Sequence, residues 1–136
     1  YQRKGSNWET IKNNVIQLKK ESWIALNVHP TINNYNIWDI QDLFNWANNN
    51  KIVIVTNILH GPERLCIRNL PIEIKEKIKE KHGSDSRMRT ILNYLDGDRD
   101  PLVVDFIPET EFIDNIRNEN FQKVFPEWSK LIYAYM

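Results

Sequence analysis

The segment that decides the fold is residues 22–62, which read SWIALNVHPTINNYNIWDIQDLFNWANNNKIVIVTNILHGP. It contains two short apolar runs, WIALNV at 23–28 and KIVIVT at 51–56. Between these runs, one set of apolar residues recurs at helical spacing: Ile40, Leu43, Phe44 and Ala47. A strand, a helix and a second strand in this order predict two parallel strands joined by a crossover helix, and therefore an α/β fold.

The two apolar runs differ in pattern. Ile24, Leu26 and Val28 alternate with other residues, so they should point to one face of the first strand. The run 52–55 is β-branched and apolar without alternation. This pattern is typical of a parallel strand that is covered on both faces.

Helices are predicted on both sides of this unit. Ser6 and Glu9 read as a capping box at the start of a helix over 7–20. A further helix is expected over 72–82, another around 88–95, and two more between 108 and 135, broken near Pro126. We expect the helical tryptophans to pack into the core: Trp8, Trp38, Trp46 and Trp128.

Composition limits the classes of function. The 136 residues are 41% hydrophobic and 26% charged, as in one globular domain. Eighteen basic residues balance 18 acidic ones, so a nucleic-acid partner is not expected unless Lys and Arg gather on one face. No apolar run approaches the about 20 residues of a membrane helix, so no membrane partner is expected. The single cysteine, Cys66, favours a reducing, cytoplasmic setting and is predicted to be buried and inert.

Four segments, in this order, resemble the C-terminal half of radical S-adenosylmethionine enzymes of the short twitch-domain type. They are YQRKGSNWETIKNNV (1–15), NVHPTINNYNIWDIQDLFNW (27–46), VTNILHGPERLCIRNLP (55–71) and FIDNIRNENFQKVFPEW (112–128). The resemblance implies the C-terminal portion of a partial (β/α) barrel over 1–107, with a helical extension over 108–136 packed on it in a single domain. Such a barrel holds S-adenosylmethionine against a [4Fe–4S] cluster, which generates a radical that abstracts hydrogen from a small-molecule or peptide substrate.

The chain departs from this family at the cluster. Family members bind it through an N-terminal C-x3-C-x2-C motif, and one cysteine cannot supply three thiolates. We therefore expect a C-terminal part of a longer enzyme, cut before Tyr1, that is inactive alone and leaves a sheet edge unpaired through which it associates. The alternative is a non-catalytic α/β binding or scaffold module.

The resemblance also directs attention to the strand ends. Asn27, Thr31 and Asn33 follow the first strand, and Asn57 and Leu59 follow the second. Amide and hydroxyl groups can bond to ribose or adenine, and a leucine can pack on the adenine face. The alternative interpretation is that the asparagines only cap and turn the chain.

Arg3 matches the family's contact to the methionine carboxylate, for which a guanidinium is well suited. No residue is assigned a catalytic or metal-binding role.

Overall fold

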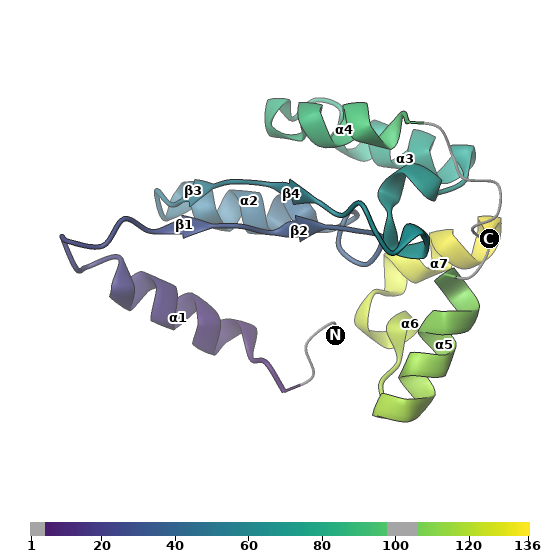
Figure 1. The fold of residues 1–136 in the computed structure, drawn as a ribbon, viewed down its shortest axis with the longest axis horizontal. Coiled ribbons are helices and arrows are strands. Elements are labelled where there is room, and N and C mark those ends of the chain that lie inside the picture. Colours follow the sequence, from purple (N-terminus) through teal and green to yellow (C-terminus); the bar gives the residue numbers. More distant parts are fainter. Residues whose placement is uncertain (1–4, 98–105) are drawn as a thin grey trace.

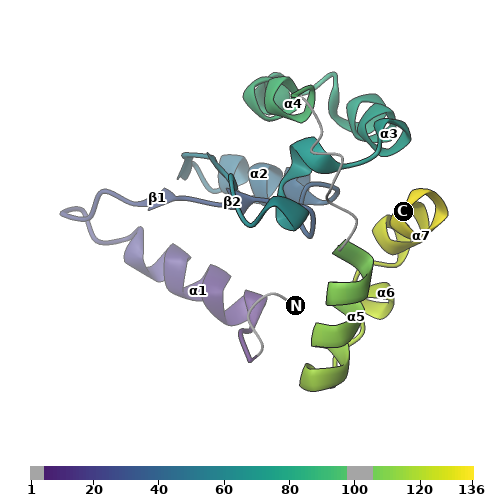
Figure 2. The same ribbon diagram turned by 45° about the vertical axis from the view of Figure 1, so that its right-hand side comes forward.

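The structure, a computed structural model, describes residues 5–97 and 106–136. Its elements follow one another in this order: α1 (Trp8–Leu18), β1 (Asn27–Val28), β2 (Thr31–Ile32), α2 (Ile40–Asn49), β3 (Val53–Ile54), β4 (Asn57–Ile58), the 3-10 turns η1 (Glu63–Leu65) and η2 (Ile67–Asn69), α3 (Ile72–His82), the 3-10 turn η3 (Ser86–Met88), α4 (Arg89–Leu95), α5 (Phe106–Arg117), α6 (Phe121–Val124) and α7 (Pro126–Tyr135). Figures 1 and 2 show a narrow ribbon of strands, with α1 along one side of it and α3 to α7 gathered near its far end.

The strands form a parallel two-stranded ribbon. Asn27 lies opposite Val53 in β1 and β3, and Thr31 lies opposite Asn57 in β2 and β4, with the same offset in both pairs. A hydrogen bond from the Asn57 N–H to the Pro30 carbonyl (3.0 Å) joins the two pairs. Pro30 has no N–H that could donate a hydrogen bond back across the ribbon, and this explains why the first strand is divided into β1 and β2 at this residue.

This arrangement confirms the prediction that the two apolar runs lie side by side and point the same way. The fold is therefore mixed, mostly helical, with parallel strands. The first strand begins later than predicted, at Asn27, because the chain turns at Trp23, which is 80% exposed. Ile24, Leu26 and Val28 are half-buried and alternate with exposed neighbours, as their pattern predicted.

Only one face of the ribbon is covered. Phe44 and Ala47 of α2 are buried on one side, where Ile52 is buried and Ile54 is half-buried. Val53, on the opposite face, is 60% exposed. The prediction that residues 52–55 are covered on both faces is therefore wrong. An unbroken apolar run permits burial of both strand faces. Burial of the second face also requires a layer of structure packed on it, and α1 does not provide that layer.

Helix α1 packs beside α2. The Trp8 and Trp46 rings meet edge to face with their centroids 5.2 Å apart, and the Lys19 ammonium donates to the Asn50 carbonyl at the end of α2. None of the residues of α1 is buried. The helix also begins one residue later than the capping-box pattern indicated, because the N-cap is Asn7, whose side chain accepts from the Thr10 N–H.

The main core joins the end of the ribbon to the C-terminal helices. Trp128 of α7 is fully buried, stacks on Trp38 (5.3 Å between ring centroids) and donates its indole N–H to the Asn34 carbonyl (2.7 Å). Phe106 and Phe121 are buried in the same cluster. The prediction that these tryptophans pack into the core holds for Trp128 and for Trp38, which packs against the core from the turn before α2 and not from a helix. Trp46 is half-buried and Trp8 is 46% exposed.

The C-terminal segment has three helices in its described part, where two were predicted. The extra break follows Arg117, where Asn118 has a positive φ of 52°. Asn120 then caps α6 by accepting from the Lys123 N–H. The break near Pro126 and the helix over 72–82 occur as predicted. Within the described residues, no helix has the length and apolar character needed to cross a membrane.

Candidate functional site

Three of the residues predicted from the strand ends share the uncovered face of the ribbon. Asn27, Thr31 and Asn57 are exposed and alternate with half-buried or buried neighbours. Because the register pairs Thr31 with Asn57, their side chains stand next to each other on the same face. Asn27 lies upstream on the strand that carries Thr31. The uncovered face therefore presents one hydroxyl and two amides. Thr31 and Asn57 lie toward the carboxyl ends of the strands, whereas Asn27 begins β1 and so lies at the amino end, not after the strand as predicted.

The other predicted residues are placed differently. Asn33 is buried, its side-chain oxygen accepts from the Tyr35 N–H (2.9 Å), and its amide donates to the Thr31 carbonyl (3.3 Å). It therefore turns the chain, which is the alternative interpretation of these asparagines. Leu59 is half-buried beyond β4, and its N–H extends the ladder to the Ile32 carbonyl (2.9 Å). Arg3 lies outside the described residues.

A polar corner follows the carboxyl end of β4. The Arg68 guanidinium donates to both carboxylate oxygens of Glu63 (2.8 and 2.7 Å), and the Asn69 amide donates to the Glu63 carboxylate and main-chain carbonyl (2.8 and 2.9 Å). These hydrogen bonds lower the pKa of Glu63, those from Arg68 first. Sequence reasoning missed this corner because the residues are not spaced like neighbours on one face of a helix or a strand.

A thiol and a phenol near this corner are partly or fully buried. The Cys66 thiol is buried and donates to the Pro62 carbonyl (3.5 Å), and burial raises its pKa. Its burial confirms the sequence prediction, and a thiol of this kind is a poor nucleophile and metal ligand. Burial also raises the pKa of Tyr94, whose hydroxyl donates to the Leu59 carbonyl (3.3 Å) and whose ring meets His60 edge to face.

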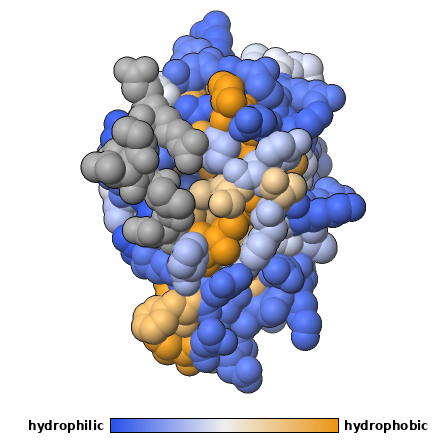
Figure 3. Space-filling model, turned by 90° about the vertical axis from the view of Figure 1, so that its right-hand side faces the viewer, coloured by the Kyte–Doolittle hydropathy of each residue, from blue (hydrophilic) through white to orange (hydrophobic). Residues whose placement is uncertain are grey.

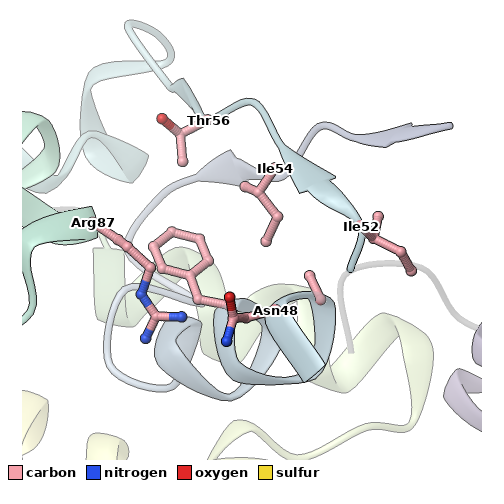
Figure 4. Close-up of a pocket in the computed structure, with 7 residues that line it drawn as sticks. Asn48, Ile52, Ile54, Thr56 and Arg87 are labelled. Atoms are coloured by element: carbon pink, nitrogen blue, oxygen red, sulfur yellow. The ribbon is translucent and has the colours of Figure 1, made fainter. Parts of the chain in front are cut away.

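A pocket of about 360 Å³ lies on the other side of the ribbon, between α2 and β3. Four apolar residues line it, Phe44, Ala47, Ile52 and Ile54, together with three polar ones, Asn48, Thr56 and Arg87. Figure 4 shows Asn48, Ile54, Thr56 and Arg87 around this space. Sequence reasoning did not identify the pocket, because Arg87 reaches it only through the tertiary fold.

The charge of Arg87 is already balanced. Its guanidinium donates to the Asp85 carboxylate (2.6 Å) and to the side chain of Asn45 (2.8 Å). The Arg87 hydrogen bonds lower the pKa of Asp85 to about 2, so Asp85 stays ionised at neutral pH. The pocket therefore offers no free positive charge to an anionic ligand.

The described residues contain no group of three or more His, Cys, Asp or Glu side chains that could hold a metal ion. Comparison of the chain with protein-family models, with curated proteins and with solved structures finds no match.

Proposed function

We propose that this chain supplies later strands of a partial (β/α) barrel of the radical S-adenosylmethionine type, and that the uncovered face of its ribbon forms part of the S-adenosylmethionine pocket. The observation that carries the proposal is the pairing of Thr31 with Asn57 on that face, with Asn27 four residues upstream on the same face. The motif order of the sequence supports the family, and the geometry supports the location of the pocket.

The distribution of the helices agrees with a barrel piece. In a (β/α) barrel the helices lie outside the strands, and ligands bind at the carboxyl ends of the strands. Here α2 covers one face of the ribbon, and α1 makes its aromatic contact with α2. The opposite face carries Val53, Val55 and the three polar residues, and it would correspond to the inner face of the barrel.

The residues on this face suit the nucleoside part of the cofactor. Asn27 and Asn57 offer amide donors and acceptors for ribose hydroxyls or adenine nitrogens, and the Thr31 hydroxyl can do either. Leu59 continues the ribbon at the carboxyl end, where an apolar side chain could support the adenine ring. The role proposed for these residues is to bind and orient the ligand.

An iron–sulfur cluster does not fit the residues of this chain. Its ligands are cysteine thiolates, and Cys66 is buried with its thiol hydrogen-bonded to a carbonyl. In the parent enzyme that we propose, the cluster would therefore be held by another part of the protein, and no step is assigned to it here.

The test is a titration of the chain with S-adenosylmethionine by isothermal calorimetry, with amide chemical shifts to locate the site. Thr31→Val and Asn57→Leu should each weaken binding about tenfold, because one hydrogen bond is worth about 1 kcal/mol or slightly more. Thr56→Val is the matched control, because Thr56 lies on the covered side. No saturable binding to the folded chain, or binding that neither variant weakens, would refute the proposal.

The second candidate is a non-catalytic α/β binding module. The observation that favours it is the exposure of Val53 and Val55 on the same face, which suits contact with another protein surface. A folded chain that ignores S-adenosylmethionine, but loses a protein partner when Val53 is replaced by Lys, would favour this module.

A further inference from the structure

The outer edge of β3 and β4 carries backbone groups that the ribbon does not use. The N–H groups of Val55, Asn57 and Leu59 point inward and donate to the carbonyls of Val28, Pro30 and Ile32 (3.0, 3.0 and 2.9 Å). In a parallel ladder, the N–H and C=O groups of the residues between them must point to the opposite edge. These residues are Ile54, Thr56 and Ile58, and outside the ladder their N–H groups form no backbone hydrogen bond within residues 5–97 and 106–136.

The sequence of this edge has none of the features that protect an edge strand. Residues 52–59 read IVIVTNIL, with no charge and no proline. Monomeric proteins usually place Lys, Pro or a covering segment at such an edge, because an open strand pairs with other strands. Short, uncharged segments rich in β-branched residues also tend to pair with copies of themselves.

The opposite edge, along β1 and β2, is different. The Thr31 carbonyl, which faces this edge, is taken by the side-chain amides of Asn33 and Asn36 (3.3 and 2.9 Å). A strand added there would have to displace these bonds. The two edges are therefore unequal, and the β3–β4 edge is the better template for pairing.

The surroundings of the β3–β4 edge suit a second copy of the same chain. The pocket lined by Ile52, Ile54 and Thr56 lies beside the edge, so a neighbouring strand could bury apolar side chains there. The nearby Arg87 is neutralised by Asp85, so two copies would not bring unpaired charges together. The formal net charge of zero adds no general repulsion between chains.

We propose that two copies of this chain pair antiparallel through their β3–β4 edges, about a two-fold axis near Thr56, to form a four-stranded sheet. A two-fold axis perpendicular to the sheet makes the contact self-complementary and closed. It also places α2 of both copies on the same face, so the two pockets meet across the axis. The uncovered faces carrying Thr31 and Asn57 remain open on the other side.

This dimer does not depend on the proposed cofactor. Earlier barrel strands would join the β1–β2 edge, where they would have to displace the Asn33 and Asn36 amides from the Thr31 carbonyl, and S-adenosylmethionine would contact the uncovered face. Neither contact uses the β3–β4 edge. Oligomeric state and ligand binding are measured separately, so a result that refutes the dimer does not refute the S-adenosylmethionine site, and the reverse also holds.

The test is sedimentation equilibrium of the whole chain over a wide range of concentrations. The apparent mass should rise with concentration from that of the monomer to twice that value. Thr56→Pro removes the N–H at the centre of the edge and should abolish the dimer. His29→Pro, at the outer edge of the other strand, is the matched control and should leave the dimer intact. Near-ultraviolet circular dichroism must show that both variants remain folded.

Hydrogen exchange tests the same contact without a substitution. In the wild-type chain, the Thr56 amide should be protected at high concentration and exchange rapidly on dilution, whereas the Val55 and Asn57 amides stay protected at both concentrations. A monomeric mass at every concentration would overturn the proposal. The proposal would also be overturned if folded Thr56→Pro still formed the dimer. It would be overturned as well if the chain stayed monomeric and its edge bound only an extended peptide from another protein.

Discussion

The C-terminal helices and the N-terminal helix with its ribbon differ in how completely they are packed. Trp128, Phe106 and Phe121 are fully or almost fully buried around α5, α6 and α7. By contrast, α1 has no buried residue, and the ribbon has one open face and one open edge. The C-terminal body, α3 to α7, is thus tightly packed, and its core extends to Tyr35 and Trp38 ahead of α2. The N-terminal part leaves surface available for a ligand or for another chain.

The outer surface of the C-terminal body is not uniformly polar. Phe112 and Ile116 of α5 are 63% and 69% exposed. Figure 3 shows the side of the molecule formed by these helices, where apolar areas interrupt a mostly hydrophilic surface. The packing difference therefore concerns the interior of the two regions rather than their surfaces.

The largest expected effect comes from removing the central side chain of the body. Trp128→Ala should lower the free energy of unfolding by about 3–5 kcal/mol, since it leaves a cavity and breaks the hydrogen bond to the Asn34 carbonyl. Trp8→Ala in α1 is the matched control and should cost about 1 kcal/mol or less, because Trp8 is half exposed. Urea denaturation measures both. Equal losses would show that the two regions are equally well packed.

A smaller effect is expected from pH, through His82 in the interior of the body. Burial lowers the pKa of His82, and the Lys81 ammonium lowers it further. The unfolded chain therefore binds more protons than the folded one just below about pH 6.5, the ordinary histidine pKa. Stability should fall as the pH drops below this value, by at most about 1.4 kcal/mol per pH unit. Urea denaturation between pH 7.5 and pH 5.5 measures the slope.

Two variants separate His82 from the other histidines. His82→Leu should flatten the slope in this pH range, whatever its effect on absolute stability. His29→Gln, at an exposed position, is the control for replacing a histidine. If the slope survives in His82→Leu, the pH sensitivity of the body has another origin.

The smallest expected effect is confined to α1. Asn7→Ala removes the N-cap hydrogen bond to the Thr10 N–H and should destabilise this helix by about 1 kcal/mol. Asn13→Ala, in the exposed middle of the same helix, should instead stabilise it by a few tenths of a kcal/mol. Hydrogen exchange of the α1 amides measures both. A change of the same size in the amides of α7 would show that α1 and the body unfold together.

Much of the fold could be predicted because local patterns determine it. The apolar stripe of α2, the limits of α3 and the parallel order of the strands follow from spacing and from crossover geometry. The errors arise where tertiary structure decides. Whether Val53 is covered depends on a second layer, and the break at Asn118 depends on a residue tolerating a positive φ.

The candidate site was predictable to the extent that parallel register fixes it. The neighbourhood of Thr31 and Asn57 follows from the strand order. The role of Asn33 does not, because an asparagine side chain can either face a ligand or bond to the nearby backbone. The corner of Glu63 and Arg68 lies in the irregular segment after β4, so no periodic sequence pattern predicts it.

Pro30 leaves the two halves of the ribbon joined by one hydrogen bond fewer than an uninterrupted parallel pair would have. The ring nitrogen has no hydrogen to give at a ladder position where other residues would donate one. A small bend at this imino acid would change the separation of the Asn27 amide and the Thr31 hydroxyl while both strand pairs keep their hydrogen bonds. The two groups could thus adapt to ligands of different length, with the backbone rather than the side chains making the adjustment.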